Sequence, residues 1–254
     1  MSNKPYDRTS LKSLFADGNR PNAQNFGSLI DSMVNKVDDG ISKTMKDGLI
    51  LAPEGTESDR VLCFKEKIQD DLPKWSFELK QEANQGLALV QPISSNVSET
   101  RLFFTKKGAI GVGTETPKTN FEVQGVSGFE SRMGTYQMGS IPADRQWHDI
   151  TPELNGCKAF EIMAQVGKQG HGRYALLHAH ALSTFGKSWP KIRKTQARYD
   201  WRWWNRISLR FAGSTYKYRL QMRTRSNFGD GVNVKYHISK LWDDDIMNTI
   251  SAQE

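Results

Sequence analysis

Cysteine, long apolar runs and a secretory leader are scarce or missing in this sequence of 254 residues, and each absence narrows the class of protein. Cys63 and Cys157 are far apart and neither lies in a C-x-x-C pair, which predicts two buried, reduced thiols rather than a disulfide or metal site. The apolar stretches, such as LALV at 87–90, are too short to span a bilayer, which takes about 20 residues. Residues 1–18 lack the apolar run of a signal peptide, so we expect a protein made in the cytosol, not secreted by that route and not inserted in a membrane.

Apolar residues are also few, at 37% of the chain. This fraction is low for a single compact globule of this length. It suits an elongated chain whose core is completed by other subunits.

Charge and tryptophan divide the chain into two halves. Residues 1–131 hold 16 Lys and Arg against 18 Asp and Glu, whereas residues 132–254 hold 19 against 10, so the halves carry −2 and +9. Six of the seven tryptophans also lie in the second half. This composition predicts an autonomous, basic C-terminal domain with a core of its own.

The N-terminal residues predict an attachment arm followed by one helix. Residues 1–20 are polar with scattered apolar anchors, which predicts an extended arm. Asn22 can cap a helix that reaches as far as Ile41, with apolar residues at heptad spacing. These candidate oligomerisation residues are Phe26, Ile30, Met33 and Val37. An amphipathic helix packed on a globular core is the alternative interpretation.

The rest of the chain predicts a mainly β fold. Residues 49–125 contain short strands about a dozen residues apart, and in KWSFELK the side chains of Trp75, Phe77 and Leu79 share one face. After residue 131, five or more longer strands with little helix signal predict an antiparallel β-sandwich. We therefore expect three regions: an arm and helix at 1–48, a β module at 49–130 and a β-sandwich at 131–254.

Residues 108–125 read GAIGVGTETPKTNFEVQG and predict two short strands joined by a proline-containing turn. A dinucleotide-binding loop is excluded because the third glycine and the following helix are both missing. The segment resembles the "GIGT-x-x-P…LEV-x-G" segment of tail-fibre and adhesin-like proteins of phages and phage-like particles, although Val112 and Phe121 stand where Ile and Leu are common. The matching residues are Gly111, Gly113, Thr114, Pro117, Phe121, Val123 and Gly125. Residues 21–40 are similar to the "P-x-x-x-x-F-x-x-L-I-D-S" segment that precedes the shaft of such fibres.

The resemblance implies a homotrimer in which a helix leads into an intertwined β shaft, as part of a phage tail or a contractile injection particle. In such a shaft, Gly111 and Gly113 are candidate oligomerisation residues, since glycine fits where three chains approach an axis. The self-cleaving chaperone domain that ends many such fibres has no match here.

Residues 187–225 form a strongly basic stretch, with 12 Lys and Arg against Asp200 alone. A hairpin with its loop at 212–215 would place Arg210 opposite Lys217 and Arg202 opposite Arg225, and such like-charge pairs predict an anionic partner. The candidate binding residues are Arg202, Trp204, Arg206, Arg210, Lys217, Arg219, Arg223 and Arg225. The partners that fit are, in this order, carboxylates of a neighbouring subunit, a cell-surface glycan and nucleic acid. The alternative is a basic face that contacts only solvent.

Catalytic patterns are absent from the sequence as we interpret it. His178 and His180 share one face of a predicted strand, but no further ligand can be recognised, so no metal or cofactor is assigned. No Ser-His-Asp order stands out. The sequence therefore predicts a structural, non-enzymatic component of a phage-tail-like contractile injection particle, with a glycan-recognising receptor-binding adhesin as the alternative.

Overall fold

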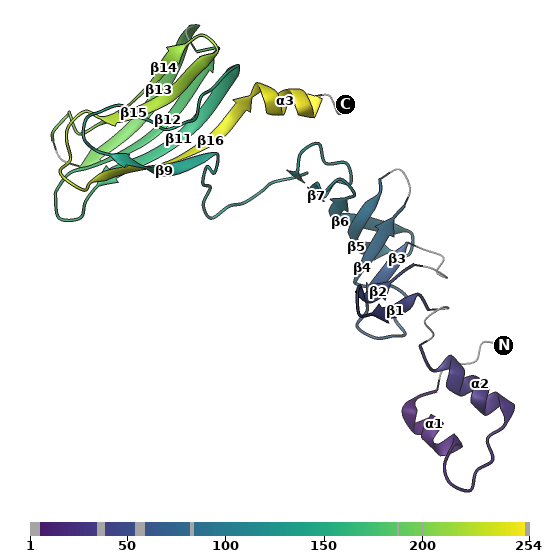
Figure 1. Cartoon of the computed structure of the whole chain (residues 1–254). Helices are drawn as coiled ribbons and strands as arrows, with labels where there is room; N and C mark the ends of the chain where they lie inside the picture. The colour runs from purple at the N-terminus through teal and green to yellow at the C-terminus, as the bar shows by residue number, and fades with distance from the viewer. Residues whose placement is uncertain are drawn as a thin grey trace. The chain divides into compact units, whose positions relative to one another are not determined.

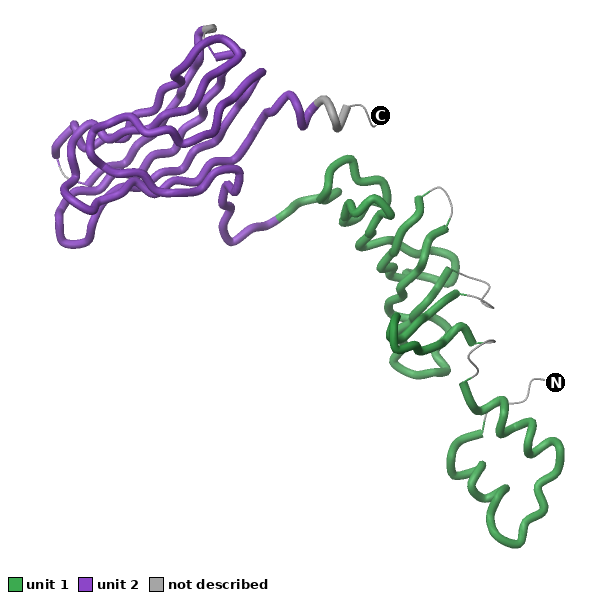
Figure 2. The backbone as a smooth tube through the Cα atoms, in the orientation of Figure 1, with its two compact units in different colours: residues 1–127 green, residues 128–254 purple. Residues whose placement is uncertain are grey.

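The computed structural model describes residues 6–34, 39–53, 59–81, 84–186, 188–199 and 201–251. The chain divides into two compact units, residues 1–127 and 128–254 (Figure 2). The division lies three residues before the predicted boundary at 130. Strands make up 49% and helices 9% of the protein, which confirms the mainly β prediction.

Two short helices begin unit 1 (Figure 1). Helix α1 (Arg8–Leu14) is capped by Asp7, whose carboxylate accepts from the Ser10 amide at 2.7 Å. Helix α2 (Ala23–Asp31) is capped by Asn22 as predicted. The extended-arm prediction is wrong for residues 8–14, because Asp7 supplies a helix cap that the sequence interpretation overlooked.

Helix α2 also ends ten residues before the predicted end at Ile41. The Ser32 hydroxyl donates to the Ser28 carbonyl at 2.7 Å, and it accepts from the Tyr6 amide at 3.1 Å. Hydroxyl contacts of this kind compete with the helical ladder and favour its end. Met33 lies beyond the helix, and Val37 lies outside the described residues. The helical heptad prediction is therefore wrong at Met33.

The remainder of unit 1 is β-structure. Strands β1 (Ile41–Thr44) and β2 (Gly48–Leu51) form an antiparallel hairpin. A six-stranded sheet follows in chain order, antiparallel except for the parallel pair β7–β8. Its strands are β3 (Arg60–Phe64), β4 (Trp75–Lys80), β5 (Gly86–Ser94), β6 (Val97–Thr105), β7 (Ile110–Val112) and β8 (Phe121–Val123). The last two are the short strands predicted around the proline-containing turn.

Unit 2 is the predicted antiparallel sandwich. A five-stranded sheet has the order β13-β12-β11-β16-β9, and a three-stranded sheet has the order β10-β15-β14. The strands are β9 (Gln137–Pro142), β10 (His148–Asp149), β11 (Cys157–Gly167), β12 (Tyr174–Thr184), β13 (Ser188–Tyr199), β14 (Ile207–Ser214), β15 (Lys217–Thr224) and β16 (Asn233–Asp243). Helix α3 (Asp244–Ser251) follows β16.

The two sheets enclose one hydrophobic core. Buried and more accessible residues alternate along β11 and β12, so every second side chain of each strand points into the sandwich. Phe160, Ile162 and Leu177 from the larger sheet are fully buried together with Leu220 and Met222 from the smaller one. The core explains why unit 2 folds as a unit with its own packing.

Two features of the basic stretch differ from the predictions. The sequence interpretation missed β13 and extended the following strand through residues 201–206, which instead form a turn. The predicted hairpin register is also wrong. Strands β14 and β15 meet at a two-residue turn after Ser214, so Phe211 pairs with Leu220 rather than with Tyr216. Tyr216, the second residue of this turn, takes a positive φ angle of 67°, as residues of tight hairpin turns do.

Both cysteines are free thiols as predicted, but neither is buried, contrary to the prediction. Cys157 is half-buried and Cys63 is exposed on β3, and neither forms a disulfide. Cys63 is accessible because β3 is an edge strand of its sheet. Within the described part of the chain, no helix has the length and apolar character needed to cross a membrane.

Candidate functional site

One face of the six-stranded sheet in unit 1 is apolar and largely uncovered by the chain itself. The register brings large apolar residues of neighbouring strands opposite one another, with Leu62 beside Phe77 and Leu87 beside Phe104. This apolar face consists of Leu62, Phe64, Trp75, Phe77, Leu79, Leu87, Leu89, Leu102, Phe104, Ile110, Val112, Phe121 and Val123. All of these residues are exposed or half-buried, and none is fully buried.

The opposite face of this sheet holds its small core. Ala88, Val90 and Phe103 are buried there, and Ser76 and Glu78 lie beside them. Burial alone would raise the pKa of Glu78, but the hydrogen bond and charge of Lys80, with further hydrogen bonds from Ser76 and Arg60, lower it below its usual value. The shared face of Trp75, Phe77 and Leu79 is therefore confirmed, yet it is the polar side of β4 that is buried.

The other candidate oligomerisation residues have separate positions. Phe26 and Ile30 are exposed on α2, and Phe26 contacts Phe15 with ring centroids 5.4 Å apart. Gly111 and Gly113 both have a reason to be glycine within one chain. A Cβ on Gly111 would lie 2.1 Å from the Thr114 carbonyl oxygen, and Gly113 has φ +73°. Their place at an inter-chain axis stays a prediction.

The basic residues predicted as one binding surface separate into three places in unit 2. The first is the outer face of the three-stranded sheet. The guanidinium carbons of Arg210 and Arg223 lie 4.3 and 4.4 Å from the ring centre of Trp147. Arg219 lies on this face too, and its guanidinium pairs with the carboxylate of Asp149 at 3.2 Å. Cation–π contacts and an ion pair satisfy much of this charge within the chain.

The predicted like-charge pairs on this face are wrong. Arg210 lies opposite Gln221, and its Nε donates to the Gln221 side-chain oxygen at 2.8 Å. Lys217 lies opposite Ser214 at the turn. The like-charge argument for an anionic partner therefore fails, because the hairpin turn lies further along the chain than the sequence interpretation placed it.

The second place is a cavity between the two sheets at one edge of the sandwich, here called the basic cleft. It has a volume of about 270 Å³ and is lined by Lys194, Gln196, Arg198, Arg206 and Arg225. In β13, the three lining residues lie opposite core residues of β12, so they extend the inner face of the sheet beyond the core. Among the described residues, no carboxylate forms an ion pair with its four cations.

Electrostatics and hydrogen bonds shape the basic cleft. Burial lowers the pKa of Lys194, and the charges of Arg225 and Arg206 lower it further. Gln196 lines the cleft and holds the backbone of β14. Its amide nitrogen donates to the Ile207 carbonyl at 2.7 Å, while its oxygen accepts from the Ile207 amide at 3.0 Å. The concentration of positive charge favours an anionic group in the cleft.

The third place is the turn at 201–206, whose last residue, Arg206, also lines the basic cleft. Trp204 lies between Trp201 and Trp203, with ring centroids 5.9 and 6.0 Å away, and all three rings are accessible. The buried Asn205 anchors the turn by accepting from the Ser226 hydroxyl at 3.0 Å. Arg202 is half-buried in the same turn.

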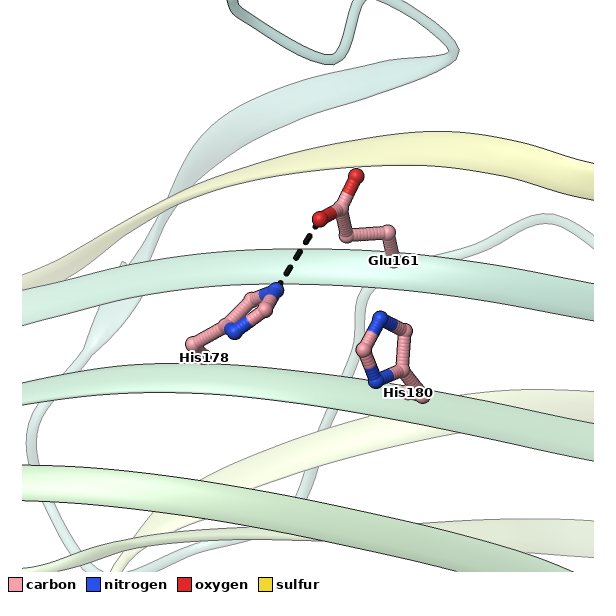
Figure 3. Close-up of side chains that lie close together, drawn as sticks. All are labelled: Glu161, His178 and His180. Atoms are coloured by element: carbon pink, nitrogen blue, oxygen red, sulfur yellow. Dashed lines mark hydrogen bonds and ion pairs between the residues drawn. The ribbon is translucent and has the colours of Figure 1, made fainter.

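A cluster on the outer face of the five-stranded sheet joins the two histidines singled out in the sequence to a carboxylate (Figure 3). His178 and His180 lie on β12, and Glu161 lies on the neighbouring β11 directly opposite His180. The Nε2 atom of His178 contacts Oε1 of Glu161 at 2.9 Å, and Arg132 donates to Oε2 at 2.6 Å. The His178 hydrogen bond, followed by the charge of Arg132, holds the pKa of Glu161 below its usual value.

The sequence interpretation missed several of these residues. Lys194, Gln196 and Arg198 alternate along one strand, so recognising β13 would have placed them on one face. Trp147 and Glu161 carry no comparable signal, because their contacts depend on strand pairing between distant segments. No protein-family model and no curated protein matches this chain.

Proposed function

We propose that this protein is a non-enzymatic, fibre-like structural component of a phage-tail-like contractile injection particle, assembled as a homotrimer through unit 1. The N-terminal segment and the basic C-terminal domain then provide contacts to neighbouring proteins of the particle. The observation that carries the proposal is the apolar face of the six-stranded sheet. Soluble monomers rarely expose contiguous apolar patches of this kind, which mark interaction surfaces.

The apolar face can contribute substantial association energy. Seven of its residues are more than a third exposed, among them Leu87 at 37% and Phe104 at 38%. Full burial of a large apolar side chain stabilises by about 1.5–3 kcal/mol, so covering the exposed part of one contributes about 0.6–1.2 kcal/mol. Seven such residues supply about 4–8 kcal/mol per chain, and the half-buried ones add to this.

Copies of this same chain are the partner that fits the face. Its residues carry no charge that would require an oppositely charged partner, so like faces can pack against one another around a common axis. Identical subunits that present one patch to an axis form a closed ring, which leaves none of the patches exposed. The two segments that resemble phage fibres support three copies and the particle, since that resemblance implies a trimeric shaft.

Charge placed on the apolar face tests the proposal. We expect the parent chain to have a native mass near three times 28.8 kDa. Replacing the cross-strand pair, Leu87→Glu with Phe104→Glu, should yield monomers, because burying each carboxylate costs several kcal/mol. The control is Ile68→Glu, a change at a 94% exposed residue outside the strands, which should remain trimeric. A parent chain that is a monodisperse monomer at micromolar concentration by native mass spectrometry would contradict the proposal.

A second candidate function is a receptor-binding adhesin that recognises an anionic cell-surface glycan. The basic cleft and the tryptophans of the turn at 201–206 favour it, because sulfate, phosphate or carboxylate groups fit the cations and sugar rings pack on aromatic faces. Arg206→Gln with Arg225→Gln should then abolish binding to sulfated but not neutral glycans. Unchanged glycan binding together with loss of the protein from purified particles would favour the structural role instead.

A further inference from the structure

We propose that Glu161, His178 and His180 form a binding site for one divalent transition metal ion of the Zn²⁺ type on the outer face of the five-stranded sheet. The site belongs to a single chain and does not depend on the proposed assembly. Figure 3 shows the three side chains gathered above two neighbouring strands.

The donor atoms are already close to the spacing that a metal requires. One ligand atom from each of the three residues lies within 4.8 Å of the other two. In a four-coordinate zinc site with ligands at about 2.0–2.2 Å, neighbouring donors are about 3.3–3.6 Å apart. The rings of His178 and His180 have centroids 4.9 Å apart, so modest side-chain rotations bring the three donors around one ion.

The backbone beneath the three ligands is held firmly. The residues that flank them along β11 and β12, namely Phe160, Ile162, Leu177, Ala179 and Ala181, are buried in the core of the sandwich. Both strands pair over eleven residues without interruption. The ligands therefore project from a rigid two-strand platform, which favours a preformed site.

The choice of donors defines the class of metal. Two imidazoles and one carboxylate suit Zn²⁺, Cu²⁺, Ni²⁺ or Fe²⁺, whereas Ca²⁺ and Mg²⁺ prefer oxygen ligands alone. Arg132 binds Oε2 of Glu161, so Oε1 is the oxygen that can bind the metal. The hydrogen bond that Oε1 now makes with His178 would be replaced by coordination of both groups to the ion. Such an outer contact orients a ligating carboxylate.

The site also has access to solvent. A cavity of about 400 Å³ is lined by both histidines, Arg193, Lys194 and Thr195. His180 is exposed and His178 is half-buried, so at least one coordination position faces water. Arg193 lies opposite His180 in the sheet, and its positive charge favours water or an anion, rather than a further cation, beside the metal.

Calorimetric titration of the metal-free full chain with ZnCl₂ tests the site, using protein without a polyhistidine tag. We expect one Zn²⁺ per chain, and at least tenfold weaker binding in His180→Ala. This variant leaves the Glu161–His178 hydrogen bond in place. The matched control is His171→Ala, at an exposed residue of the loop between β11 and β12, which should bind as the parent does. Absence of Zn²⁺ binding, or equal affinity in all three proteins, would overturn the proposal.

A second measurement on the unaltered protein keeps the test independent of variant folding. Diethyl pyrocarbonate modifies accessible histidines, and mass spectrometry locates the modified positions. Zn²⁺ should protect His178 and His180 at least severalfold while His171 reacts at its original rate. Equal reaction of all three histidines with and without Zn²⁺ would contradict the proposed site.

Discussion

Gln196 should be one of the most important polar residues for the stability of unit 2. Its side-chain amide makes two hydrogen bonds with the backbone of Ile207, at 2.7 and 3.0 Å, and so joins the edge strand of the larger sheet to the first residue of β14. Ile207 is fully buried. Gln196 is half-buried, and its side chain also lines the basic cleft.

The cost of Gln196→Ala follows from these contacts. A buried backbone group left without a partner costs about 1–3 kcal/mol. The two contacts are half-buried beside the basic cleft, so water can replace part of them, and we expect a loss of about 1–3 kcal/mol in the free energy of unfolding. This is a large part of the 5–15 kcal/mol that holds a typical domain folded.

Urea unfolding of the full chain, followed by tryptophan fluorescence, measures the effect, because six of the seven tryptophans lie in unit 2. Gln221→Ala is the matched control. Gln221 also makes side-chain hydrogen bonds, to Arg210 and Asp149, but these are exposed, and their loss should cost less than about 1 kcal/mol. A Gln196→Ala variant within about 0.5 kcal/mol of the parent would refute the reasoning, since it would show that the Ile207 groups find other partners.

Two further predictions concern unit 2. Lys158 and Asp243 form a buried ion pair, so Asp243→Asn should lower the free energy of unfolding at pH 7 by about 3–5 kcal/mol in urea titrations. Burial alone would raise the pKa of Asp243, but hydrogen bonds from Lys158 and Lys240 lower it. The difference in unfolding free energy between parent and variant should therefore persist above about pH 4 and shrink as the pH falls below that. A difference that stays constant down to pH 2 would contradict this assignment. Trp147→Leu should lower stability by about 1–2 kcal/mol through loss of both cation–π contacts, and Trp147→Phe should restore part of it; equal losses in the two variants would exclude an aromatic contribution.

The sequence by itself determined where many strands lie and which of their side chains share a face. Alternation of apolar and polar residues predicted the shared face of Trp75, Phe77 and Leu79, because side chains of a strand point to opposite sides in turn. The number of strand-like segments after residue 131, with little helix signal, predicted the sandwich. Local capping chemistry likewise predicted the start of α2 at Asn22. These features depend only on residues close together in the chain.

Long-range packing decided what alternation leaves open. On β4, Ser76 and Glu78 face the small core and the apolar side chains face outward, although hydrophobicity alone favours the reverse. The hairpin register depends on the position of the two-residue turn, which includes Tyr216 at φ 67°, and a shift of that turn changes every cross-strand pair.

The candidate sites show most clearly which features depend on local sequence and which depend on the complete fold. The sequence displays His178 and His180 as a pair, but Glu161 lies 17 residues from His178 and reaches it only through the pairing of β11 with β12. The basic cleft combines β13 with residues at the ends of β14 and β15, from two different sheets. Local residue order sets the chemistry that each strand carries, whereas the pairing of distant strands sets which of those groups meet, because contact energies depend on positions that only the complete fold defines.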